Sequence, residues 1–240
     1  MKLHIQTTTE ALSRELADWI VLDAEARISA SGQYTLVLSG GSTPKKLYDL
    51  LASESYKSKI DWKKVHLFWG DERYVPFDDE RNNGKMAYEA LIKHVEVPDE
   101  QVHYMDTTIP PEASARSYAY LLHRYFDKAD FTFDLVLLGM GDDGHTLSLF
   151  PGSPVIQEKD LWVAAPFVPA QDMYRITLTS AVVNRSRLVA FLVTGEGKAE
   201  TLKEVVNGPY RPDTWPSQVI QPADGALHLF ADQAAGRLIR

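Results

Sequence analysis

The stretch 134-DLVLLGMGDDGH-145 joins a short apolar run to a turn that holds three glycines in six residues. The run 134-DLVLL-138 predicts the most hydrophobic strand, at the centre of a mostly parallel sheet. The glycines relax the limits on backbone conformation, so backbone N–H groups can face a ligand closely. This combination is typical of α/β sheets, in which ligands bind beyond the carboxyl ends of the strands.

Strand and helix patterns alternate on both sides of this stretch. The other expected strands are residues 34–39, 65–69, 174–179, 188–193 and 227–230. The expected helices are residues 9–30, 44–51, 84–93, one after Pro111 and one that ends near Val206. Such alternation predicts an α/β fold with a Rossmann-like, mostly parallel sheet and helices on both faces. We expect a single domain over residues 1–240, with a small added lobe formed by the region 80–130.

The composition excludes several classes of protein. The 240 residues include 25 Lys and Arg, 33 Asp and Glu, and no cysteine, so the net charge of −8 disfavours nucleic-acid partners. The lack of cysteine excludes disulfides, thiolate catalysis and iron–sulfur clusters. No apolar run approaches the roughly 20 residues of a membrane helix, and the first ten residues lack the apolar core of a signal peptide. We therefore expect a cytoplasmic monomer that binds neither membranes nor nucleic acid.

Four of the predicted strands end in polar turns with glycine, at residues 40–44, 70–76, 139–145 and 194–198. Strands of a parallel sheet bring their carboxyl ends to one edge, so the turns we expect there would border one crevice. This convergence points to a ligand site more strongly than any single turn does.

The first turn has the residues of a phosphate site. Gly40 and Gly41 allow close approach of the backbone, and Ser42 and Thr43 add hydroxyl donors. A helix that starts at Pro44, with Thr43 as its N-cap, would point its positive end at the turn. The alternative is an ordinary tight turn with a helix cap.

Charged residues of the other turns could contact the same ligand. Asp71, Glu72 and Arg73 are consecutive, so at most two of them can face it. An arginine grips an anion with two N–H groups, and an aspartate can orient a catalytic group or bind a sugar hydroxyl. Arg175 and Lys198 could add positive charge near a phosphate. The alternative for each of these residues is a solvated charge or a surface ion pair.

His145 ends the third turn, where we expect a helix to begin. Histidine changes its charge near neutral pH and can act as a general base. Asp143, two residues earlier, could fix the orientation or the tautomer of the ring. No histidines have the spacing of a metal site, and GMGDDG is a weak match to the dinucleotide fingerprint. We expect an acid/base enzyme with no metal and no cofactor that acts on a phosphorylated small molecule.

Five stretches in this order resemble the 6-phosphogluconolactonase family: 38-LSGGSTPKKLYDLL-51, 65-VHLFWGDERYVP-76, 134-DLVLLGMGDDGHTLSLFPG-152, 175-RITLT-179 and 194-TGEGKAETL-202. The resemblance implies a glucosamine-6-phosphate deaminase-like fold. It also implies metal-free hydrolysis of 6-phospho-D-glucono-1,5-lactone to 6-phospho-D-gluconate, a step of the oxidative pentose phosphate pathway.

The resemblance also implies roles for individual residues. His145 matches the catalytic base, with Asp143 and Gly141 as its companions, and Asp71 and Arg73 match a pair near the substrate. The positions that match a 6-phosphate site are Gly41, Ser42, Arg175 and Lys198. In the segment 80-ERNNGK-85, Asn83 matches the family asparagine, whereas Asn82 and Gly84 depart from the family pattern.

Two other functions are compatible with parts of this pattern. A glucosamine-6-phosphate deaminase would also carry a GxGxDGH turn, but this chain has Phe150 where that family has a glutamate. A non-catalytic sugar-phosphate sensor would keep the phosphate turn and lose the base, whereas His145 and Asp143 are both present.

Overall fold

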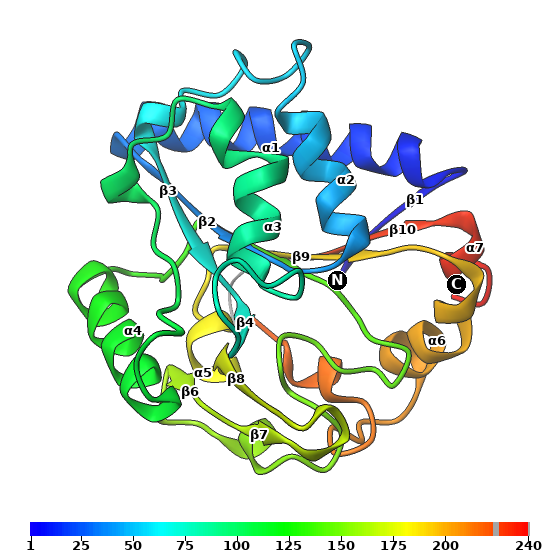
Figure 1. Ribbon diagram of the computed structural model, residues 1–240. Coiled ribbons are helices and arrows are strands. Elements are labelled where there is room, and N and C mark those ends of the chain that lie inside the picture. The colour runs from blue at the N-terminus through cyan, green and yellow to red at the C-terminus, as the bar shows by residue number, and fades with distance from the viewer. Residues whose placement is uncertain (223–225, 240) are drawn as a thin grey trace.

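The computed structural model describes residues 1–222 and 226–239, and its main sheet consists of six parallel strands (Figure 1). In spatial order they are β1 (Lys2–Gln6), β10 (Ala226–Asp232), β9 (Leu188–Val193), β5 (Leu135–Leu138), β2 (Tyr34–Leu38) and β3 (Val65–Trp69). The strand order reverses between β2 and β5, because the chain adds β3 outside β2 and later adds β9 outside β5. Ligand sites of open α/β sheets form at such a point.

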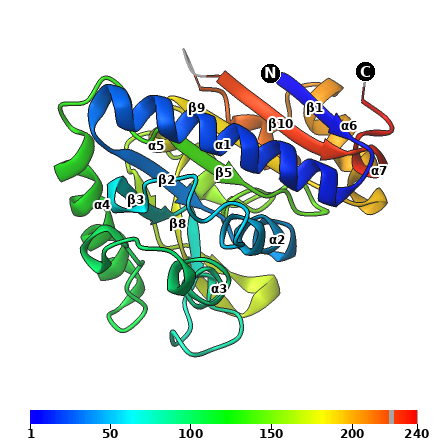
Figure 2. The same ribbon diagram turned by 90° about the horizontal axis from the view of Figure 1, so that it is seen from above.

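Helices cover both faces of this sheet. On one side lie α1 (Thr9–Ser31), α2 (Ser42–Leu51) and α3 (Asn83–Ala90), and Figure 2 shows α1 extended across the strands. The predicted stripe of α1, which is Leu12, Leu16, Ile20 and Ala24, is fully buried. The remaining helices are α4 (Pro111–Phe126), α5 (Ser180–Val183), α6 (Ala199–Asn207) and α7 (Gln233–Gly236). Among the described residues, none of the helices is both long enough and apolar enough to cross a membrane.

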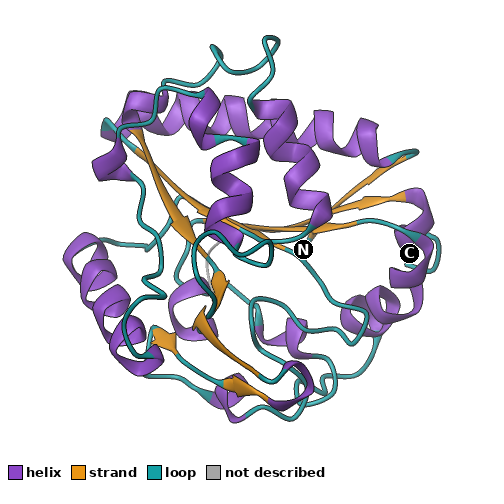
Figure 3. Cartoon of the chain, viewed as in Figure 1, coloured by secondary structure: helices purple, strands orange, loops and turns teal. Residues whose placement is uncertain are grey.

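A second, antiparallel sheet lies beside the main one (Figure 3). It contains β4 (Asp71–Arg73), β8 (Met173–Leu178) and β6 (Val163–Ala164), and β7 (Phe167–Val168) also pairs with β8. Because α4 packs against β6 and β8 while α3 packs against α2, the region 80–130 does not form the added lobe as one unit. That prediction is wrong, and the added element is this sheet with α4.

Three local expectations also fail, and one strand was not expected. That strand is β1, which is only five residues long and carries its apolar Leu3 and Ile5 exposed at the edge of the sheet. The turn expected at 70–76 contains the short strand β4. Helix α2 begins at Ser42, with Gly41 in the N-cap position at φ 107°, so Thr43 is not the cap. No helix begins at His145, since Leu147 has a φ of 54°.

Candidate active site

The four turns border one cavity of about 250 Å³ at the carboxyl ends of β2, β3, β5 and β9. Of the predicted site residues it is lined by Gly40, Gly41, Ser42, Thr43, Asp71, Arg73, Gly141, His145, Arg175 and Lys198. Asp143 is not part of the lining and contacts His145 instead. A larger hollow of about 740 Å³ lies near Trp62 and His94, and it contains none of the predicted residues. The cavity at the strand ends is therefore the candidate site.

Asp143 fixes the imidazole of His145. The His145 Nδ1 lies 2.6 Å from Oδ1 of Asp143, and the backbone N–H of His145 donates to the same oxygen at 3.1 Å. Burial alone would raise the pKa of Asp143, but the hydrogen bonds from His145 outweigh it and hold this pKa below its ordinary value. An ionised carboxylate keeps the proton on Nδ1, so Nε2 retains a lone pair that can accept a proton.

This pair requires glycine at position 141. A Cβ on Gly141 would lie 2.1 Å from Nδ1 of His145 and 2.6 Å from Oδ1 of Asp143. The backbone N–H of Gly141 donates to the carbonyl of His145 at 2.8 Å, which closes the turn beneath the ring. The glycine is present because the histidine and the carboxylate occupy the space of its side chain.

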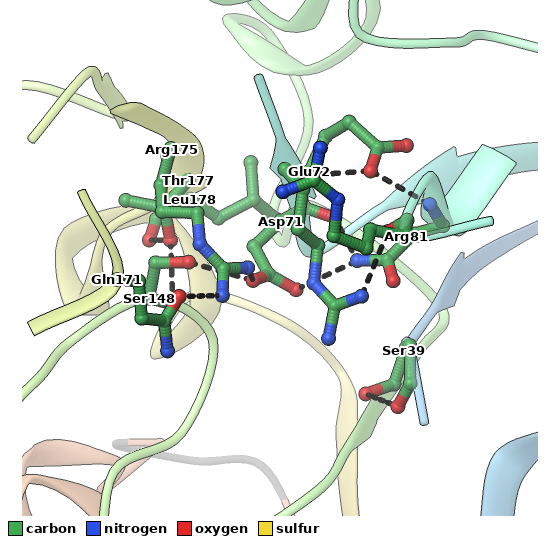
Figure 4. A network of polar contacts seen from close by, with 12 residues as sticks. Ser39, Asp71, Glu72, Arg81, Ser148, Gln171, Arg175, Thr177 and Leu178 are labelled. Atoms are coloured by element: carbon green, nitrogen blue, oxygen red, sulfur yellow. Dashed lines mark hydrogen bonds and ion pairs between the residues drawn. The ribbon is translucent and has the colours of Figure 1, made fainter. Parts of the chain in front are cut away.

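Strand β4 aims Asp71 and Arg73 at the cavity and Glu72 away from it, because side chains alternate along a strand. Asp71 accepts a hydrogen bond from Oγ of Ser148 at 2.6 Å and lies 3.5 Å from Nη1 of Arg175 (Figure 4). Arg73 donates through Nη1 to the carbonyl of Arg81 at 2.7 Å. Asp71 is thus held by neighbours while it lines the site.

Arg175 and His145 both lie near the ring of Phe150. The guanidinium of Arg175 is 5.8 Å from the ring centre of Phe150, and that ring lies 4.3 Å from the ring of His145. Arg175 is only 5% exposed and also donates to Gln171. Burial lowers its pKa, and the nearby Asp71 opposes that effect. Packing and one carboxylate therefore hold this cation in the wall of the cavity that His145 also lines.

Glu72 and Asn83 help to build the site, although neither was among the predicted site residues and Asn83 was matched only as a family asparagine. The Glu72 carboxylate accepts from the backbone N–H groups of Arg73, Asn83 and Gly84, and so caps the start of α3. Burial raises the pKa of Glu72 to about 7, although these hydrogen bonds oppose the rise. Asn83 lines the cavity and donates to the Asp71 carbonyl at 2.9 Å.

Asn83 also explains the glycine at position 40. A Cβ on Gly40 would lie 2.1 Å from Oδ1 of Asn83. The Asn83 amide therefore packs directly against the first turn while it is bonded to the second. The contact with Gly40 joins residues 43 positions apart and the bond to Asp71 joins residues 12 positions apart, so no local sequence pattern predicts them.

The first and fourth turns give the cavity the features of an anion site. Gly41 and Ser42 lie at the start of α2, where backbone N–H groups lack partners within the helix. Thr43 Oγ1 is 2.8 Å from Oγ1 of Thr194, which brings the first and fourth turns together. Lys198 lines the cavity, and its Nζ is 2.6 Å from the Asp142 carboxylate. The sequence indicated the lysine but not its carboxylate partner.

Within the described ranges, no cluster of three or more His, Asp or Glu side chains has the arrangement of a metal site. The polar side chains of the cavity are instead one imidazole, one carboxylate, two guanidinium groups, one ammonium group, hydroxyls and one amide. This set can accept a proton at Nε2 of His145 and hold an anion with Lys198 and the start of α2.

Comparison with known proteins identifies the family. Residues 7–229 match the model of the family described as glucosamine-6-phosphate isomerases/6-phosphogluconolactonase. A 6-phosphogluconolactonase of Synechocystis is 41% identical over 217 residues, which are 89% of this chain and 88% of that protein. Its counterpart in rat is 36% identical and covers 99% of this chain and 93% of its own.

Solved structures share the fold. A 6-phosphogluconolactonase from Trypanosoma brucei superposes with a TM-score of 0.86 at 28% identity and covers 100% of this chain and 98% of its own. A monomeric glucosamine-6-phosphate deaminase reaches a TM-score of 0.85 at 19% identity, over 99% and 100% of the two chains. At 19% identity the deaminase shows only that the fold is shared, whereas the sequence matches show the family. The chain therefore belongs to the family of glucosamine-6-phosphate isomerases and 6-phosphogluconolactonases.

Proposed function

We propose that the protein hydrolyses 6-phospho-D-glucono-1,5-lactone to 6-phospho-D-gluconate in the oxidative pentose phosphate pathway. The observation that carries the proposal is the His145–Asp143 pair, whose imidazole opens on the same cavity as the glycine turn at the start of α2. A base and an anion site in one cavity suit a phosphorylated substrate that reacts with water. The relatives named 6-phosphogluconolactonase support the same activity.

Binding of the phosphate would orient the lactone for reaction. The backbone and hydroxyls of Gly40–Thr43 would hold the phosphate, with Lys198 and Arg175 supplying positive charge. This placement brings C1 of the lactone near His145 and converts binding energy into orientation. Asp71 would contact the sugar from β4.

His145 would then act as the general base. Its Nε2 removes a proton from water as the water oxygen forms a bond to C1, and the carbonyl oxygen becomes an oxyanion. Backbone N–H groups of the glycine turn or the guanidinium of Arg73 stabilise this charge. The C1–O5 bond then breaks, and the proton passes from His145 to O5. Asp143 holds the ring in the required tautomer throughout.

Phe150 favours this reaction over deamination. A ring-opening isomerase would need an additional acid or base beside the histidine, and an apolar ring lies there, 4.3 Å from His145. A non-catalytic sensor is disfavoured by the retained His145–Asp143 pair. We also propose that the chain forms a single domain, is a monomer and lies in the cytoplasm. Light scattering after gel filtration tests whether it is a monomer.

The test uses two substrates with the purified protein. Freshly generated 6-phosphogluconolactone should be hydrolysed with saturation, well above the spontaneous rate, while glucosamine 6-phosphate should release no ammonia. Ammonia release without acceleration of lactone hydrolysis would overturn the proposal. Saturable binding of 6-phosphogluconate by a protein that hydrolyses neither compound would indicate a sensor.

A further inference from the structure

We propose that Ser217, Trp215 and Thr201 are positioning residues that set the orientation of Asp143 and, through it, of His145. The segment 208–222, which contains the short 3-10 helix Pro216–Val219, would then hold the turn of the active site in place. The inference rests on the proposed function of His145 as a base. It concerns residues that line no part of the cavity.

Asp143 itself has little packing to hold it. Its side chain is 49% exposed, and its Oδ1 forms hydrogen bonds with the ring and the backbone N–H of His145. Its direction must therefore come from the backbone on either side. The carbonyls of Asp142 and Gly144, which flank it, are both held by hydrogen bonds from outside the turn.

Ser217 holds the Gly144 carbonyl with two donors. Its backbone N–H donates to that oxygen at 2.9 Å and its Oγ donates at 2.8 Å. A carbonyl oxygen has two lone pairs, so both are used. Ser217 is only 2% exposed, and the bonds are shielded from competing water.

Thr201 performs the same task on the other side of Asp143. It lies in α6 and donates from Oγ1 to the Asp142 carbonyl at 2.6 Å. The two bonded carbonyls leave little freedom for the peptide units around Asp143. A shift of either unit would move the carboxylate away from Nδ1 of His145.

Trp215 closes the turn from outside. Gly144 has a φ of 74°, and a Cβ there would lie 2.8 Å from Cε3 of Trp215. The indole Nε1 is buried without a hydrogen-bond partner among the described residues, so packing rather than hydrogen bonding places the ring. The indole of Trp215 therefore packs directly against Gly144.

The supporting segment is itself anchored. The side chain of Gln218 accepts from the backbone N–H of Arg211 at 2.7 Å. It also donates to the carbonyls of Glu204 and Pro209, each at 3.1 Å. These bonds tie the segment to the end of α6, from which Thr201 also projects. Ser217 and Thr201, which hold the turn, thus belong to segments that are hydrogen-bonded to each other.

The test compares Ser217→Ala and Thr201→Val with Ser186→Ala. Ser186 is 3% exposed and bonds Thr132 at 3.1 Å near the amino ends of β5 and β9, so its loss removes a similar buried hydrogen bond far from the cavity. We expect about a tenfold loss of kcat for the first two variants, with little change in KM, because a displaced base weakens the reaction and not phosphate binding. Ser186→Ala should retain wild-type kcat.

A second measurement does not depend on lactone hydrolysis. The ¹⁵N shifts of the His145 ring should report a uniform Nδ1–H tautomer in the wild type and a mixture in the variants. Unchanged kcat and unchanged ring shifts in Ser217→Ala and Thr201→Val would overturn the inference. An inactive wild-type protein would contradict the proposed function alone, and the ring shifts would still test the positioning role. If Ser217→Ala does not fold, Thr201→Val carries the comparison.

Discussion

Asp143 and His145 form a hydrogen bond of 2.6 Å on a turn that has no space for a side chain at position 141. The bond leaves Nε2 as the ring atom that can accept a proton from the cavity side. The placement of Asp143 and His145 therefore fixes the tautomer of the base and requires glycine at position 141.

Replacement of Asp143 by asparagine tests the carboxylate. The amide cannot hold a proton on Nδ1 by charge, so we expect kcat to fall by about 10²-fold with a small change in KM. Because the pKa of Asp143 is lowered in the fold, the interaction is intact at neutral pH and is lost only as pH falls through that lowered value. Retention of wild-type kcat in Asp143→Asn would contradict the role given to this residue.

Gly141→Ala tests the space beneath the ring. The added Cβ would overlap Nδ1 of His145, so the ring or the turn must move. We expect activity to fall at least 10²-fold because small displacements of a base are costly. Binding of 6-phosphogluconate, measured by calorimetry, should remain, since the anion site lies on other turns. An active Gly141→Ala enzyme would show that the turn tolerates the displacement.

Asp142→Asn should strengthen substrate binding. The carboxylate of Asp142 pairs with Lys198 at 2.6 Å and competes with a phosphate for that cation. Asp142 is 84% exposed, so the pair is weak and the expected decrease in KM is about two- to fivefold. Asp49→Asn is the matched control, because it removes one charge from an exposed lysine pair on α2. A higher KM in Asp142→Asn would mean that Asp142 holds Lys198 in its binding position.

The raised pKa of Glu72 should make the free energy of unfolding depend on pH. Its pKa in the fold is about 7, above the ordinary value of 4.5, because burial disfavours the charged form. As pH rises, the unfolded chain loses this proton near pH 4.5, whereas the folded chain keeps it until about pH 7. The stabilisation that is present below pH 4.5 is therefore lost as pH rises to about 7. The loss is about 3 kcal/mol from the difference between these two values.

Denaturant unfolding of the wild type and Glu72→Gln at several pH values measures this effect. The unfolding free energy of the wild type minus that of Glu72→Gln should fall by about 3 kcal/mol as pH rises from 4.5 to 8, because only the wild type must ionise this side chain. A difference that is constant over this range would show that Glu72 stays ionised, held by the three N–H groups of α3 and β4.

Local patterns predicted the features that depend on neighbours in the chain. The apolar run Leu135–Leu138 and the four glycine turns indicated a parallel sheet with a site at its carboxyl edge, and the turns do border one cavity. The edge strand β1 was not predicted, because five residues with two aliphatic side chains are a weak local pattern. Its pairing with β10 depends on residues more than 200 positions away.

The supports of the site were beyond local patterns for the same reason. Asn83 touches Gly40, and Ser217 binds Gly144, so each acts on a residue distant in sequence. A polar residue in a loop has many possible partners, and only the folded chain selects one. The antiparallel sheet was missed because β4 and β6 are only three and two residues long.

The most direct test of the account is the rate of 6-phosphogluconolactone hydrolysis by the wild type and by His145→Ala, after subtraction of the spontaneous rate. We predict saturable hydrolysis by the wild type and a loss of about 10²–10⁴-fold in kcat for the folded variant. Hydrolysis by His145→Ala at nearly the wild-type rate would contradict the assignment of His145 as the base.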